Sequence, residues 1–173
     1  MEILKNQLCP LCKTNNLELK EEKTEVPHFG NLYLFSMHCS NCHYSKTDVE
    51  GQDPQEPSSY TITVDKEEDM NIKVIKSSTA AIKIPQLRMS VKPGPASDGY
   101  ITNIEGVLKR FEEIIESERD NAEDEEIKKK AKNLLKKIRK VKFGDMPLKI
   151  IIEDPSGNSS IISEKAEVKK IKP

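Results

Sequence analysis

Four cysteines near the amino terminus form the pattern that carries the clearest chemistry in this sequence. They occur as two pairs, Cys9-Pro10-Leu11-Cys12 and Cys39-Ser40-Asn41-Cys42. A two-residue spacing lets one tight turn present both thiolates to one ion, and two such turns complete a tetrahedral shell. Four thiolates leave no open position for a substrate, so Cys9, Cys12, Cys39 and Cys42 are predicted to bind one structural Zn²⁺.

Other readings of these cysteines are weaker. The string from Cys39 to His43 also fits haem attachment, but that chemistry normally requires export and leaves the first pair unexplained. A redox pair of the thioredoxin type needs a flanking βαβ unit, which the sequence does not show. Any of His28, His38 and His43 could replace a cysteine as ligand, yet a complete cysteine set favours ordinary histidines.

Composition sets limits on the partner and the compartment. The 173 residues carry a net charge of -1, so no overall positive field favours nucleic acid, and a protein partner is the simpler expectation. The amino terminus lacks a signal peptide, and no apolar stretch approaches the roughly 20 residues of a membrane span. We therefore expect a cytoplasmic protein without a membrane partner.

The cysteine pairs need strands to position them. Alternation over residues 32–38 predicts a strand that enters the second pair, and residues 17–20 predict one that leaves the first, as in a zinc ribbon. Apolar residues between the pairs, namely Phe29, Leu32, Tyr33 and Phe35, are candidates for partner contact or core. The polar segment 50–59, with two prolines, predicts a boundary near residue 55. The domains would then be a zinc-ribbon finger over 1–54 and a second domain over 55–173.

The second domain shows mostly β character. Short alternating runs predict strands at residues 60–64, 72–76, 80–84 and 87–91. Residues 148–153 and 160–163 flank a turn at 154–158 and predict a β-hairpin, and residues 166–171 are a candidate edge strand. Asp154, in this turn, is interpreted as a turn residue whose side chain accepts a local backbone hydrogen bond.

The middle of the chain changes to a helical period, which predicts an inserted helical hairpin over about residues 103–142. Ile104 to Ile115 carry the first apolar stripe, with a capping box of Thr102 and Glu105 at its start. Residues 127–141 carry the second, on a helix rich in lysine. Because no aromatic residues alternate with the lysines, this lysine-rich helix is interpreted as a solvated face in preference to a nucleic-acid surface.

No catalytic motif is visible. The sequence lacks a recognisable nucleophile, phosphate-binding or paired-acid motif, and all three histidines precede residue 44. A non-enzymatic protein is therefore predicted.

Several separated motifs resemble the ZPR-type zinc-finger family over most of the chain. Besides the cysteine pairs, the likeness rests on residues 26–30, residues 74–85 with the letters VIKSSTAAIKIP, residues 99–106, and residues 154–159 with the letters DPSGNS. Family members usually have glycine where this chain has His43. If the turn there needs a positive φ, histidine is among the better alternatives.

The resemblance implies a mainly β chain in which the four-Cys ribbon precedes a domain of the double-stranded β-helix type. It also implies a non-enzymatic protein that binds translation elongation factor one-alpha, a GTPase, and assists its folding. This chain holds one copy of a unit that eukaryotic members repeat, as archaeal members do. The alternative function is an RNA- or ribosome-associated zinc ribbon that uses the lysine-rich helix.

Overall fold

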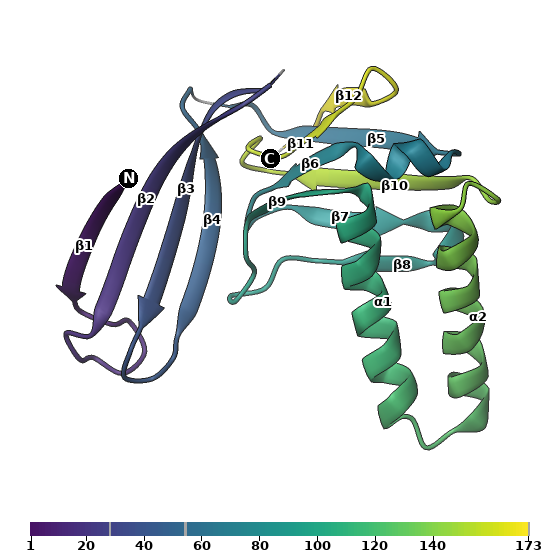
Figure 1. Cartoon of the computed structure of the whole chain (residues 1–173), viewed down its shortest axis with the longest axis horizontal. Coiled ribbons are helices and arrows are strands. Elements are labelled where there is room, and N and C mark those ends of the chain that lie inside the picture. Colours follow the sequence, from purple (N-terminus) through teal and green to yellow (C-terminus); the bar gives the residue numbers. More distant parts are fainter. Residues whose placement is uncertain (28, 54, 173) are drawn as a thin grey trace.

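The computed structural model describes residues 1–27, 29–53 and 55–172. Its amino-terminal part forms one antiparallel sheet of four strands (Figure 1). The strands follow one another in chain order: β1 Glu2–Gln7, β2 Leu17–Val26, β3 Gly30–Cys39 and β4 Ser45–Gly51. In register, Leu17 lies opposite Cys39, and Leu19 lies opposite Met37. β2 and β3 include the two predicted strands and extend beyond them. β1 and β4 were not predicted.

The rest of the chain forms a β domain of two sheets. A five-stranded sheet has the order β12-β5-β10-β7-β8, and a three-stranded sheet has the order β11-β6-β9. Their bounds are β5 Ser58–Val64, β6 Lys73–Lys76, β7 Ala81–Ile84, β8 Met89–Val91, β9 Tyr100–Asn103, β10 Leu148–Asp154, β11 Ser160–Ile162 and β12 Glu167–Lys170. Short 3₁₀ turns lie at Glu67–Asn71 and Pro85–Leu87. The fold class predicted above, mainly β with a helical hairpin, is confirmed.

The predicted hairpin between residues 148–153 and 160–163 is wrong. β10 pairs with β5 and β7, whereas β11 pairs with β6 in the other sheet. The turn at residues 154–158 therefore carries the chain from one sheet to the other. Local turn chemistry was read correctly, but the partners of both strands are distant in sequence.

Two antiparallel helices, α1 Ile104–Asn121 and α2 Glu125–Lys142, form the predicted helical hairpin and extend away from the sheets (Figure 1). Their apolar faces bury residues such as Leu108, Phe111 and Ile138 in the core of the β domain. The predicted capping box is wrong by one residue. Thr102 stays in β9 opposite Val74, and the side chain of Asn103 caps α1 by accepting from the Gly106 N–H at 2.8 Å.

The finger sheet packs on the three-stranded sheet of the β domain. Val26, Leu32 and Val49 of the finger form one buried cluster with Ile75 of β6, and Ile101 and Ile162 pack against it. The two parts thus share a small core across the predicted boundary. In the described ranges, no helix combines the length and apolarity that a membrane crossing needs.

Candidate metal centre

The four cysteine sulfur atoms converge at one end of the finger sheet. Cys9 and Cys12 lie in the turn after β1, and Cys39 and Cys42 lie where β3 ends. All four Sγ atoms lie within 4.8 Å of one another. The Sγ atoms of Cys9 and Cys42 are 3.7 Å apart, and those of Cys12 and Cys39 are 3.6 Å apart. Tetrahedral zinc with bonds of about 2.3 Å places its sulfur ligands about 3.8 Å apart, so the spacing fits one zinc ion.

The two cysteine turns have the same backbone plan. The N–H of Lys13 donates to the carbonyl of Cys9 at 3.1 Å, and the N–H of His43 donates to that of Cys39 at 2.9 Å. Lys13 and His43 both have a left-handed backbone, with φ of 58° and 59°. The position that glycine usually fills in the family therefore does require a positive φ. Histidine tolerates this conformation better than bulky or β-branched residues do.

The surroundings of the sulfur atoms shift the pKa values of Cys12, Cys39 and Cys42. The Thr14 hydroxyl, 3.1 Å from the Cys12 Sγ, and the Thr14 backbone lower the pKa of Cys12 to about 5. Backbone hydrogen bonds from Cys42 and Asn41 lower the pKa of Cys39. The backbone of Tyr44 acts in the same direction on Cys42, but partial desolvation and the neighbouring thiols of Cys12, Cys39 and Cys9 outweigh it and raise the pKa of Cys42 to about 12. Four thiolates therefore need a cation at their centre.

The surroundings of the sulfur atoms are partly apolar. Cys9 and Cys39 are buried together with Leu17, and Leu19, Met37 and Tyr44 pack against this cluster. Cys42 is exposed. A site of four thiolates against an apolar wall can hold zinc and brace two turns, and it offers no position for a substrate.

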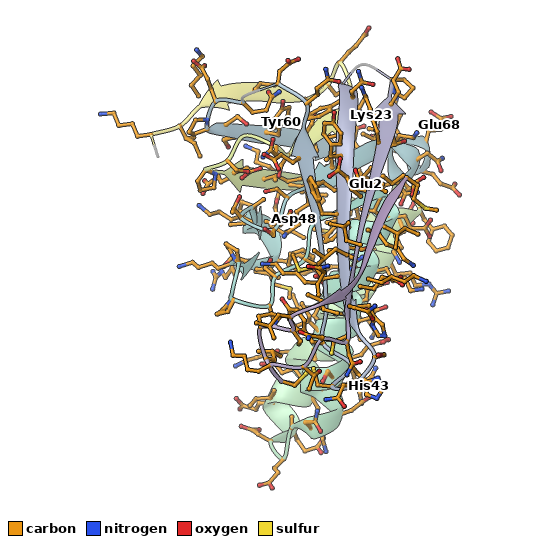
Figure 2. All side chains as sticks on the ribbon, turned by 90° about the vertical axis from the view of Figure 1, so that its left-hand side faces the viewer. Glu2, Lys23, His43, Asp48, Tyr60 and Glu68 are labelled. Carbon is orange, nitrogen blue, oxygen red and sulfur yellow. The ribbon has the colours of Figure 1, made fainter. Side chains whose placement is uncertain are left out.

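The remaining candidates from the sequence fall in several places. His43 supplies a turn backbone and His38 is an exposed strand residue, while His28 lies outside the described residues. Leu32 and Phe29 belong to the cluster shared with the β domain. Tyr33 and Phe35 stack on each other, half-buried, with ring centroids 6.3 Å apart. Figure 2 looks onto the finger sheet, with His43 at the cysteine end and Lys23 toward the other end.

The lysine-rich helix is α2, and most of its cations form no ion pair in the part of the chain that the structure describes. Lys128 pairs with Glu125, and Lys142 pairs with Glu112 of α1. Among the described residues, the other lysines of α2 form no ion pair, and neither does Arg139. Spacing along the helix places Lys129, Lys132, Lys136 and Lys140 near one another on its exposed side.

Sequence reasoning missed the extent of a buried hydroxyl network around Asp154. The side chain is fully buried, and it accepts the local backbone bond from Ser156 expected of the turn. It also accepts hydroxyls from Ser77, Thr79, Ser156 and Ser159 at 2.6–2.8 Å. The available signal was the density of Ser and Thr in the segments 77–79 and 156–159.

Comparisons with known proteins agree with this architecture. The ZPR1 zinc-finger domain matches residues 2–54, and the ZPR1 jelly-roll domain matches residues 68–172. An uncharacterized ZPR1-like protein of Methanocaldococcus jannaschii is 36% identical over 168 residues, which cover 96% of this chain and 85% of that protein. A similar protein of Pyrococcus horikoshii is 36% identical, over 94% of this chain and 75% of that protein.

This chain covers only part of the length of its eukaryotic relatives. The zinc finger chaperone of Schizosaccharomyces pombe is 27% identical over 158 residues, which cover 89% of this chain and 34% of that protein. The expected four-Cys finger thus corresponds to the ZPR1 zinc-finger domain, and the expected β-helix-like domain that follows it corresponds to the ZPR1 jelly-roll domain. The four cysteines of the finger lie close enough to bind one zinc ion. The chain belongs to the ZPR1 zinc-finger family.

Proposed function

We propose that this chain is a non-enzymatic, cytoplasmic binding protein that holds translation elongation factor one-alpha and assists its folding. The zinc finger supplies a rigid platform, because a closed four-thiolate site braces two turns and performs no chemistry on a substrate. The name of the S. pombe relative supports a chaperone role. The elongation factor is the partner implied by the family resemblance of the sequence.

The observation that carries the proposal is an apolar groove on the helical hairpin. Ile114 of α1 and Ile127 of α2 are 46% and 41% exposed, although each lies on a helix that buries other apolar residues. They line a groove of about 890 Å³ together with Ala122 and polar side chains that include Arg110 and Glu113. An apolar floor with a charged rim suits an incompletely folded protein segment.

The test is retention of purified elongation factor one-alpha on the immobilised, zinc-loaded chain. The double variant Ile114→Ser with Ile127→Ser removes apolar surface that is already exposed, so it should fold normally yet retain at least fivefold less partner, a loss of about 1 kcal/mol. Val168→Ser, at an exposed position of β12, is the matched control. Absent retention by the unaltered chain, or equal loss in the control, would refute the proposal.

The unpaired cations of α2 favour a second candidate, an RNA- or ribosome-associated role. Lys129, Lys132, Lys136 and Lys140 could follow a phosphate backbone, and such binding weakens steeply as salt rises. Binding of a fluorescent RNA should then fall when all four are changed to glutamine. RNA binding that is absent, or unaffected by salt, would remove this candidate.

A further inference from the structure

A small pocket lies where the finger meets the β domain, away from the cysteines and from the hairpin groove. We call it the junction pocket, and its volume is about 190 Å³. Its walls include Phe35, Asp48 and Glu50 of the finger and Ser78, Thr79 and Ser156 of the β domain. Asp48 is labelled in Figure 2. A pocket this size is below the range of small-molecule sites and fits one long side chain.

Two motifs from the sequence meet at this pocket. Ser77, Ser78 and Thr79 belong to the segment at residues 74–85, and Ser156 belongs to the turn at residues 154–159. The metal site and the hairpin groove use neither segment. Their convergence on the edge of the finger sheet gives these two segments a common location.

The hydroxyl groups of the pocket have defined directions. Ser77, Thr79 and Ser156 each donate to the Asp154 carboxylate at 2.7–2.8 Å, and the Ser78 hydroxyl donates to the Asp48 carboxylate. A hydroxyl has one proton but two lone pairs. Thr79 also lies 3.0 Å from the Ser156 Oγ and Ser156 lies 3.3 Å from the Ser77 Oγ, so each of these protons has an acceptor inside the cluster. A ligand in the pocket therefore meets these hydroxyl oxygens as acceptors.

The charges agree with the hydroxyl directions. Asp48 and Glu50 contribute carboxylates to the wall, and Asp154 lies buried behind it. One neighbouring cation, Lys76, donates to the carbonyls of Ser77 and Asp98 at 3.0 and 3.2 Å and offsets only part of this charge. A wall of acceptors with net negative charge repels phosphate and carboxylate ligands.

A metal ion fits less well than an organic cation. The Asp48 Oδ1 already accepts from the N–H groups of Ser78 and Val49 at 2.8 Å, and the Asp154 oxygens are occupied by hydroxyls. A metal would have to displace these donors. A guanidinium group brings donors of its own in one plane, and its face can stack on the half-buried ring of Phe35.

We propose that the junction pocket binds the guanidinium group of an arginine side chain on a protein partner. The proposal rests on the proposed function only for the identity of that partner. Bound there, the arginine contacts both the finger and the β domain. The fixed arrangement of the two parts thus becomes part of what the partner recognises.

The first test needs no elongation factor. Amide signals of the zinc-loaded chain are followed by NMR while N-acetyl-arginine methylamide is added, with N-acetyl-citrulline methylamide as a neutral probe of nearly the same shape. The arginine probe should shift the signals of residues 48–50, 77–79 and 156–158 and saturate in the millimolar range. No shift at these residues, or equal shifts with citrulline, would overturn the proposal.

A variant pair then tests the charge. Glu50 is exposed and makes no ion pair in the described part of the chain, so Glu50→Gln should leave the fold intact and weaken the arginine probe about twofold to fivefold. Glu22→Gln, at an exposed position of β2, is the matched control and should change nothing. Equal affinity in all three proteins would contradict the proposed role of the carboxylates.

Retention of the elongation factor shows whether the pocket proposal or the proposed function fails. If the arginine probe binds but the factor is not retained, the pocket stands and the proposed partner falls. If the factor is retained equally by the unaltered chain and Glu50→Gln while the probe fails to bind, the function stands and the pocket proposal falls.

Discussion

At the scale of single residues, Thr14 is the neighbour that most lowers the pKa of Cys12 at the metal centre. Its hydroxyl lies 3.1 Å from the Cys12 Sγ and lowers the pKa of that thiol. Thr14→Val keeps the shape but removes this hydrogen bond. Because loss of a group that supports a metal ligand typically costs 10–100-fold in affinity, we expect zinc to bind about tenfold more weakly.

The measurement is competition for zinc with a coloured chelator at fixed pH. Thr24→Val is the control, since Thr24 is a partly exposed strand residue of β2 whose side chain forms no hydrogen bond in the described residues. Equal zinc affinity in Thr14→Val and the unaltered chain would show that the Thr14 hydroxyl does not support the site.

Asp154 connects a single residue to the stability of the β domain. Burial alone raises its pKa, but hydrogen bonds from Ser159, Thr79 and Ser77 outweigh burial and hold the pKa below its usual value. Asp154→Asn removes the charge and leaves hydroxyl donors competing for one oxygen. We expect it to lower the free energy of unfolding by about 2–4 kcal/mol in urea titrations.

The same carboxylate gives a pH dependence of known sign. A carboxyl group whose folded pKa lies below the unfolded value of about 3.9 stabilises the fold above that value, and this contribution disappears as the pH falls through the folded pKa. The free energy of unfolding should therefore fall less steeply below pH 4 in Asp154→Asn. Asp145→Asn, at an exposed position, should retain the full slope. Parallel curves for all three proteins would exclude this role.

The metal site was largely predictable from residues, and the junction pocket was not. Cysteine pairs act through local turns, so their spacing alone indicates where the sulfur atoms can meet. The positive φ at His43 belongs to the same local turn, and it was considered because the family that the sequence resembles usually has glycine there. In contrast, Ser77 and Asp154 are far apart in sequence, and only strand pairing brings them together. The density of Ser and Thr in residues 77–79 and 156–159 indicates many hydroxyl groups, but it does not indicate that the two segments meet.

At the scale of elements, the start of α1 is set by Asn103. Its side chain accepts the Gly106 N–H, whereas Glu105, which the sequence assigned to a capping box, is exposed. Asn103→Ala should lower the free energy of unfolding by about 1 kcal/mol, the usual cost of losing a cap. Glu105→Ala, which removes the acceptor that a capping box needs, should change it by less than about 0.5 kcal/mol. The reverse order in urea titrations would restore the capping box predicted from sequence.

Periodicity predicted the elements with a buried stripe and also indicated β8 and β12, which have no fully buried residue, but it missed β1, β4 and β9. Both helices carry apolar residues at helical spacing, and β10 alternates buried and exposed residues. β1 has no fully buried residue, and Val49 is the only fully buried residue of β4, so neither shows alternation. These two strands form because β2 and β3 offer free edges. That cause lies outside their own sequences.

At the scale of the whole molecule, the finger and the β domain are coupled through both core and hydrogen bonds. Leu32 of the finger and Ile75 of the β domain belong to one buried cluster. Beside this cluster, the N–H of Gly99 donates to the carbonyl of Thr47 at 2.9 Å. A side chain at Gly99 would meet Asp48 at 2.5 Å, so the close approach requires glycine. The boundary near residue 55 stays a prediction, and contacts cross it.

This coupling predicts that zinc removal is felt beyond the finger. Without the ion, four thiols at the end of the finger sheet lose their common centre, and Leu32 and Val49 lose the support that keeps them against Ile75. Amide hydrogen exchange after chelation should accelerate throughout β2 and β3. It should also accelerate in β6 and β9, whose outer face the finger covers, by more than in β10 at the centre of the five-stranded sheet. Restoring zinc should reverse all of these changes. If exchange rises only in the finger, its shared core with the β domain does not couple the two parts, and the junction pocket would then keep its β-domain wall while losing its finger wall.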